Sequence, residues 1–188
     1  MEERLVHLLD ASSLKALAHP VRVRLLGLLR TDGPATATSL AARLGESSGT
    51  TSYHLRQLAL AGFVVDDETR GNGRERWWRA AQQSTRLEPA DWQDDPGVSP
   101  AVDAYLGAVL DGYARRARAW FDDRHSLPKR WRDAGTLSDF QLSLSAAELT
   151  RLVGELEQVV ESYRRAPRKG DEQVTVQLQA FPRHKVTE

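Results

Sequence analysis

The most regular pattern of apolar and polar residues in the chain lies between Ser47 and Gly62. Small or apolar residues recur there at helical spacing and predict a helix over residues 48–61. The apolar face of this helix carries Thr51, Leu55, Leu58 and Ala59. The opposite face is polar and rich in hydrogen-bond donors, and it carries Thr50, Ser52, Tyr53, Arg56 and Gln57. Such a face suits the major groove of DNA, where base edges are read by hydrogen bonds and methyl contacts.

Two short apolar segments follow this helix and flank a basic turn. Phe63 to Val65 predict one strand, and residues 75–80 predict a second, in which Trp77 and Trp78 point to opposite faces. We expect one of these tryptophans to cover the core. The Asn72-Gly73 pair between the strands is typical of a tight hairpin. The arginines of this wing are Arg70, Arg74, Arg76 and Arg79. A polar helix followed by a basic hairpin is the pattern of a winged helix-turn-helix.

Helical patterns also precede residue 47. Residues 5–17 predict a first helical region with a Ser12-Ser13 cap, and Pro20 starts an amphipathic helix that ends near Gly33. Thr38-Ser39 is expected to cap a short helix that runs through Leu44 and stops at Gly45. This short helix and the one after residue 47 are separated by a tight glycine-containing turn, which is the spacing of a helix-turn-helix.

The second half of the chain predicts a different arrangement. Residues 82–98 are polar, acidic and interrupted by proline, so we interpret them as a linker. A long helix with a broad apolar stripe follows from Ser99. Alternating residues then predict strands at 140–144 and 174–180, joined by a helix that opens with the capping box Ser145 to Glu148. This β-α-β pattern predicts an α+β class for the whole chain. The aromatic residues of this half fit either a core and dimer seam or the lining of a pocket for an apolar effector.

Charge adds a restriction. Residues 1–81 hold 11 Lys/Arg against 9 Asp/Glu, a net charge of +2, and the whole chain is neutral. The basic residues must therefore be focused on the wing, where three acids oppose them, and we expect only modest non-specific affinity for DNA. These acids are Asp66, Asp67 and Glu68. The acidic start of the chain and the lack of any long apolar run predict a cytoplasmic protein without a membrane span.

Taken together, LKALAHPVRVRLLGLL, SLAARLGESSGTTSYHLRQLALAGFV and RGNGRERWW resemble the ArsR-type winged-helix repressors, in the actinobacterial form that appends a second domain. The resemblance covers about residues 12–81. It implies a homodimeric transcriptional regulator whose recognition helix enters the major groove and whose wing lies near the minor groove or backbone. The family positions for groove contacts fall on Ser48, Thr50, Ser52, Tyr53 and Arg56.

The chain departs from the metal-sensing members of that family because it contains no cysteine. Thiolate sensing of a soft metal is therefore excluded. We expect no metal and no cofactor. We also expect no catalytic residues, because the histidines are scattered, no nucleophile accompanies them, and no glycine-rich phosphate loop is present. His54 lies near the buried face of its helix, and we interpret it as a packed side chain.

These observations predict a winged helix-turn-helix at residues 1–81, a linker at 82–98, and a dimerisation or effector domain at 99–188. The expected function is that of a regulator, most simply a repressor, that reads an inverted repeat in double-stranded DNA through helix 48–61 and wing 70–76. The residues expected to contact DNA are Ser48, Thr50, Ser52, Tyr53, Arg56, Gln57, Arg70, Arg74 and Arg76. The alternative is a protein-interaction adaptor that uses the winged helix as a scaffold without specific DNA binding. The identity of any small-molecule effector is left open.

Overall fold

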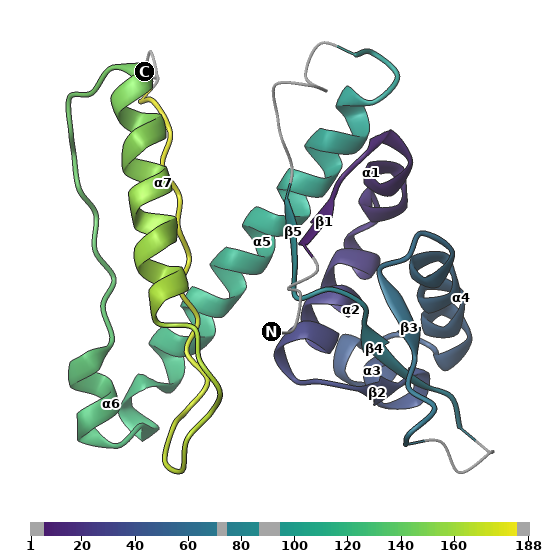
Figure 1. Ribbon diagram of the computed structural model, residues 1–188. Coiled ribbons are helices and arrows are strands. Elements are labelled where there is room, and N and C mark those ends of the chain that lie inside the picture. The colour runs from purple at the N-terminus through teal and green to yellow at the C-terminus, as the bar shows by residue number, and fades with distance from the viewer. Residues whose placement is uncertain (1–5, 71–74, 87–94, 184–188) are drawn as a thin grey trace. The chain divides into compact units, whose positions relative to one another are not determined.

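A computed structural model describes residues 6–70, 75–86 and 95–183. The chain divides into two compact units, Met1–Asp122 and Asp123–Glu188, and each is described by itself. Figure 1 shows the elements of both units along the chain. No helix within the described ranges is both long enough and apolar enough to cross a membrane.

The first unit contains five helices and five short strands among its described residues. In chain order these are β1 Val6–Leu8, α1 Ala11–Leu17, α2 Pro20–Thr31, β2 Ala35–Thr36, α3 Ala37–Leu44, α4 Ser48–Leu60, β3 Val64–Asp66, β4 Trp77–Ala80, β5 Ser84–Arg86 and α5 Ser99–Asp123, whose last residue lies in the second unit. The predicted α+β class, the N-terminal winged helix-turn-helix and the long helix from Ser99 are confirmed.

The helix starts in the first unit depend on side-chain caps, two of which differ from prediction. Asp10 caps α1 by accepting from the Ser13 N–H at 2.7 Å, so Ser12-Ser13 is not the cap. Thr36 caps α3 and forms a capping box with Ser39, so α3 begins before the predicted Thr38-Ser39 cap. An aspartate or threonine in extended backbone satisfies a free helix N–H, and in both cases such a residue stands just upstream of the predicted cap.

The N-terminal residues correct another prediction. Residues 5–17 were expected to be helical, but residues 6–8 form β1, which pairs in parallel with β5. The register places Val6 opposite Ser84. β5 lies inside the predicted linker 82–98, so part of that segment is ordered by strand pairing. Such a pairing joins residues far apart in sequence, and local helical spacing contains no information about it.

The wing is a three-stranded antiparallel sheet with the order β2-β4-β3. In its hairpin Val64 pairs with Ala80 and Asp66 pairs with Trp78. The predicted strands and the opposite placement of the two tryptophans are confirmed, since Trp78 is buried and Trp77 only half-buried. The Asn72-Gly73 turn and Arg74 lie outside the described residues.

One continuous core holds the first unit together. Leucines of α1, α2, α3 and α4 meet Phe63, Val64 and Trp78 of the wing, and Val102 near the start of α5 joins them. The core residues with no exposed area are Leu14, Leu17, Leu25, Leu40, Leu55, Leu58 and Phe63. The core therefore ties the recognition helix, the wing and the long helix into one unit.

Among its described residues, 123–183, the second unit contains a 3₁₀ turn and two helices. These are η2 Arg124–Ser126, α6 Lys129–Ala134 and α7 Ala146–Ser162. The predicted capping box at the start of α7 is confirmed, because Ser145 accepts from the Glu148 N–H and the Glu148 carboxylate accepts from the Ser145 N–H at 2.8 Å. The Ser145 hydroxyl also donates to the Glu148 carboxylate at 2.7 Å, and this bond, together with the one from the Ser145 N–H, lowers the pKa of Glu148.

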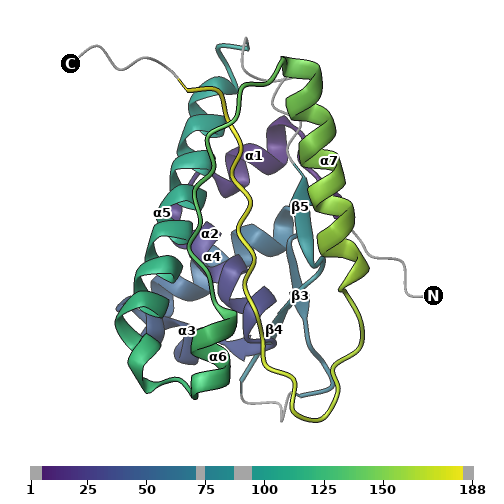
Figure 2. The same ribbon diagram turned by 90° about the vertical axis from the view of Figure 1, so that its left-hand side faces the viewer.

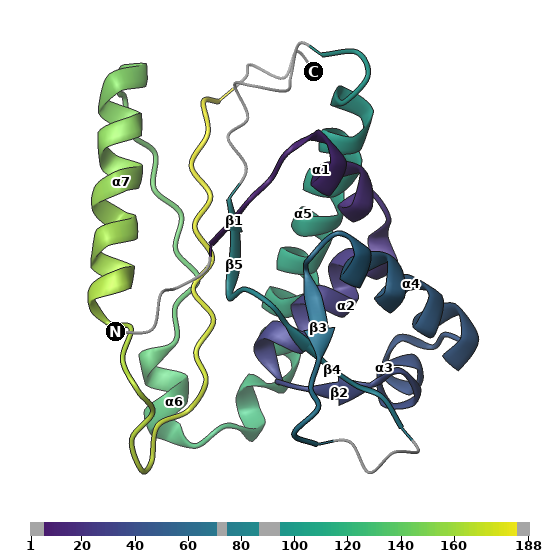
Figure 3. The ribbon, with the colours of Figure 1, turned by 45° about the vertical axis from the view of Figure 1, so that its right-hand side comes forward.

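The predicted strands 140–144 and 174–180 are wrong for the chain as described. Residues 135–145 and 171–183 are extended, but no ladder hydrogen bonds join them within the described part of the second unit. Figures 2 and 3 show that the two segments run in the same direction as each other and opposite to α7. The predicted crossover path is therefore present, whereas strand formation also requires a partner at hydrogen-bonding distance.

The assignment of residues 99–188 as a dimerisation or effector domain stays a prediction.

Candidate nucleic-acid interface

The turn between α3 and α4 is set by glycine and serine. Gly45 ends α3 with a left-handed backbone (φ 69°), a conformation that residues with a Cβ rarely adopt. Ser47 then caps α4, because its Oγ accepts from the Thr50 N–H at 3.0 Å. The chain reverses over three residues, and α4 leaves the turn with its first residues in solvent.

The inner face of α4 matches the predicted apolar face. Thr51, Leu55 and Leu58 have no exposed area, and His54 is 6% exposed. The interpretation of His54 as a packed side chain is confirmed. Gly62 ends the helix with a positive φ of 76°, and the Phe63 N–H then donates to the Leu58 carbonyl oxygen at 2.9 Å. α4 is thus anchored along one side.

The outer face of α4 presents the side chains predicted to meet DNA. Ser48, Thr50, Tyr53 and Arg56 are exposed, and Ser52 and Gln57 are half-buried. The Thr50 hydroxyl lies 2.8 Å from the Ser47 hydroxyl, so it is already engaged at the helix cap. Within the described part of the chain Arg56 has no ion-pair partner.

A hollow of ≈ 390 Å³ separates the outer face of α4 from the wing. Ser52 and Arg56 line it from α4, and Arg76 lines it from the segment leading into β4. Its other lining residues are Thr36, Ala37, Thr38, Glu75 and Trp78. Three of the predicted residues, Ser52, Arg56 and Arg76, therefore face a common space. Thr36, Thr38 and Glu75 are additions that helical spacing on α4 could not indicate.

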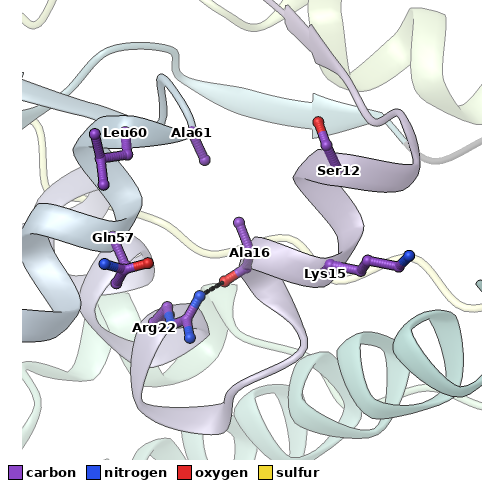
Figure 4. A pocket seen from close by; sticks show the side chains of 7 residues that line it. All are labelled: Ser12, Lys15, Ala16, Arg22, Gln57, Leu60 and Ala61. Carbon is purple, nitrogen blue, oxygen red and sulfur yellow. Dashed lines mark hydrogen bonds between the residues drawn. The ribbon is translucent and has the colours of Figure 1, made fainter.

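Gln57 faces elsewhere. It lines a second hollow of ≈ 360 Å³, between α4 and α1, together with Arg22 and Lys15. Figure 4 shows these side chains and the hydrogen bond from Arg22 to the Ala16 carbonyl oxygen, which measures 2.7 Å. Gln57 is therefore set apart from Ser52 and Arg56, although all three belong to the predicted set.

Arg76 is held against the wing by two contacts. Its Nε donates to Oδ2 of Asp66 at 2.6 Å, and its guanidinium lies 4.1 Å from the ring centre of Trp78. A cation over an indole face is attracted by the ring quadrupole. Arg76 thus forms part of the groove wall, and its charge is partly compensated by Asp66.

Arg70, which follows β3, is compensated in a similar way. Its Nε lies 3.7 Å from Oδ2 of Asp67, a residue that is itself buried. Asp67 also accepts from the Thr69 hydroxyl at 2.6 Å, which stabilises the turn after β3. The opposition between wing acids and wing arginines that the sequence predicts is thereby confirmed for Arg70 and Arg76.

His54 connects the recognition helix to the start of α2. Its ring centre lies 4.3 Å from that of His19, whose Nδ1 accepts from the Val21 N–H at 3.2 Å. Burial lowers the pKa of His54, and the nearby His19 and Arg22 lower it further against an opposing effect of Glu46. The neutral form of His54 is therefore favoured, which suits a side chain packed on the buried face of α4.

The fold and the interface define a class, the winged helix-turn-helix. Residues 17–67, from the end of α1 to the end of β3, match the family model described as a helix-turn-helix domain. No curated protein matches the chain. The match and the geometry together support a DNA-binding, regulator-like role.

Proposed function

We propose that this protein is a homodimeric transcriptional regulator of the ArsR type that acts in the cytoplasm. It reads an inverted-repeat operator in double-stranded DNA through helix 48–61 and the wing 70–76, and it represses transcription by occupying that site. No catalysis, metal or cofactor enters this proposal.

The observation that carries the proposal is the groove between α4 and the wing. Arg56 extends from an exposed helix face without an ion-pair partner among the described residues, and Ser52 and Arg76 line the same hollow. An arginine on a recognition helix contacts guanine through two hydrogen bonds, which is the commonest base-specific contact. The groove therefore combines one side chain suited to base reading with others suited to the phosphate backbone.

The first turn of α3 adds a backbone contact. Thr38 is exposed in the first turn of this helix, where the helix dipole favours an anion, while the Ser39 N–H is already bonded to the Thr36 hydroxyl. In helix-turn-helix complexes the first helix of the motif crosses the DNA backbone. We assign Thr38 to a phosphate contact that fixes the register of α4 in the major groove.

Selection of bound fragments from genomic DNA tests the proposal. We expect wild-type protein to enrich a short inverted repeat with half-sites about one helical turn apart. Fluorescence anisotropy on that fragment should show binding that weakens as salt is raised. Arg118→Ala is a matched control, because it removes an exposed arginine that pairs with Asp122 on α5, outside the motif. Failure to retain any duplex at low ionic strength would refute the proposal.

One observation favours the adaptor function as a second candidate. Arg70 and Arg76 are compensated by acids, so the wing presents less free positive charge than its sequence implies. An adaptor should pass through a heparin or genomic-DNA column at low salt, whereas a regulator should be retained and released as salt rises. Retention of the purified protein on such a column therefore distinguishes the two functions.

A further inference from the structure

The second unit leaves an unusual amount of apolar surface in water. None of its described residues is buried. Twelve large apolar side chains of the described part are instead between 37% and 81% exposed, namely Leu137, Phe140, Leu142, Leu144, Leu156, Val159, Val160, Tyr163, Val174, Val176, Leu178 and Phe181. We call this set the C-terminal apolar surface. A domain of about 60 residues normally buries roughly 60% of its unfolded area, so this unit lacks a core of its own.

The exposed apolar side chains lie on α7 and on the two extended segments, at positions where the sequence pattern predicts burial. On α7 the side chains of Leu149, Leu152 and Val153 are half-buried, but those from Leu156 onward are exposed. Over residues 140–144 and 174–180 of the two extended segments every second residue is apolar and exposed. The stripe of α7 is therefore covered only near its start.

The backbone of the two extended segments points to the same deficiency. Within residues 135–145 and 171–183 no ladder hydrogen bonds are present. The start of the second segment is nevertheless held to the loop that follows α7, because Arg165 donates two hydrogen bonds to the Asp171 carboxylate at 2.6 and 3.0 Å. These bonds, followed by one from the Arg168 N–H, lower the pKa of Asp171 to about 2. Extended segments with unpaired N–H and C=O groups are templates for pairing with another strand.

We infer that the C-terminal apolar surface packs against the same surface of a second copy of this chain, and that the two extended segments become strands only in that dimer. The inference rests on the proposed function, because it names the interface through which the regulator is dimeric. The described residues of the second unit do not supply a core among themselves.

The size of the surface fits a stable dimer. Fully buried aromatic side chains cover about 150–250 Å² each, so Phe140, Tyr163 and Phe181 expose roughly 350–600 Å² together at their fractions of 79%, 81% and 73%. The nine aliphatic members bring the total to the order of 800 Å², which is the area that each partner of a standard interface buries.

Charge balance favours an identical partner. The second unit, residues 123–188, has 11 Lys/Arg and 10 Asp/Glu, so two copies carry almost no net charge to repel each other. Closed two-fold dimers are the commonest assemblies of identical chains, and in them one surface meets itself. A surface that exposes these twelve apolar side chains, on a unit of nearly balanced charge, meets this requirement.

The absence of cysteine from the chain provides a direct test in the full-length protein. Val159→Cys places a single thiol on the C-terminal apolar surface, and Glu157→Cys places one on the opposite side of α7 as a matched control. Their rates of reaction with a chromogenic disulfide are compared over a range of protein concentrations. In the dimer the thiol at position 159 should react at least about tenfold more slowly than the control, and dilution should remove the difference.

Two other outcomes would overturn the inference. A thiol at position 159 that is fast at every concentration would mean that the surface stays open. One that is slow at every concentration would mean that the same chain covers it. Sedimentation equilibrium adds an independent measurement, in which wild-type protein should show twice the 21.0 kDa chain mass.

A second pair of variants keeps the test valid if the cysteine variant folds poorly. Val176→Asp should raise the dimer dissociation constant at least about 100-fold, because it places an unpaired charge in the interface, whereas Thr175→Asp should not. A monomer that binds the selected fragment would overturn this inference and leave DNA reading intact. A dimer that ignores every duplex would refute the proposed function and leave this inference standing.

Discussion

Arg76 donates to Asp66 across the wing at 2.6 Å, and this ion pair decides how much free charge the wing presents to DNA. Both side chains are partly exposed, so the pair itself adds at most about 1 kcal/mol to stability. Its larger consequence is electrostatic, because a phosphate must compete with the Asp66 carboxylate for the guanidinium of Arg76.

Asp66→Asn should therefore strengthen non-specific DNA binding. With the carboxylate removed, Arg76 is free to contact a phosphate, and the slope of log affinity against log salt should steepen by about one. Anisotropy on a random duplex at several salt concentrations measures this. Asp122→Asn, which releases Arg118 on α5 in the same way, should leave the slope unchanged. An unaltered slope in Asp66→Asn would show that Arg76 does not reach DNA.

Arg56 and Arg70 should respond differently to removal. Arg56→Ala should reduce discrimination between the selected site and single-base variants by about 1–3 kcal/mol, because it removes a base contact. Arg70→Ala should weaken binding to all sequences by a similar factor, because a phosphate contact carries no base information. Competition with a panel of mutated operators separates the two effects. Equal loss of specificity in both variants would contradict the assignment.

Acid should destabilise the winged helix through His54. Its pKa is lowered in the folded protein, mainly by burial, from an ordinary value of 6.5. A folded pKa below the unfolded one means that the stabilising effect is fully present above pH 6.5 and is lost as the pH falls below that value. Denaturant midpoints between pH 8 and pH 5 should decline accordingly.

Two histidine variants test whether His54 causes this decline in the denaturant midpoint. His54→Phe keeps a ring against His19 and should flatten the pH profile, whereas His125→Phe, at an exposed position of the second unit, should leave it unchanged. A profile that falls equally steeply in His54→Phe would assign the acid sensitivity to another group.

Two glycines should respond in opposite directions to alanine. Gly45 has a φ of 69°, so Gly45→Ala should destabilise the first unit by about 1–2 kcal/mol even though no atom lies within 4 Å of the added Cβ. Gly27 lies inside α2 with equally open space around it, so Gly27→Ala should stabilise by about 0.5–1 kcal/mol. Urea denaturation of both variants measures the free energies. A stabilising Gly45→Ala would show that the turn does not need its left-handed residue.

Much of the first unit was predictable because its signals are local. Helical spacing placed Leu55 and Leu58 inside and Arg56 outside, and Gly45 and Gly62 marked where α3 and α4 end. The same reasoning assigned the two tryptophans of β4 to opposite faces. Each of these features depends on residues within a few positions of one another.

The predictions that were wrong involve partners far away in sequence. Residues 6–8 pair with residues 84–86, and no helical or strand period near either segment indicates the other. The alternation at 140–144 and 174–180 predicted strands, but a strand also needs hydrogen bonds to an adjacent backbone, and none join these segments within the described part of the second unit. The surroundings of Gln57 also depend on a distant element, since it shares the polar face of α4 with Arg56 but lines the hollow beside α1, and its contact with DNA stays a prediction.

The sequence by itself determined that this protein has a capped polar helix followed by a basic hairpin, because spacing, caps and glycines act over one or two turns of chain. Only the tertiary structure decided which arginines of that hairpin are already paired, that Arg56 and Arg76 share one groove, and that His54 lies against His19. Ion pairs, grooves and ring contacts depend on distances through space, and those distances exist only once the helices have packed around their common core.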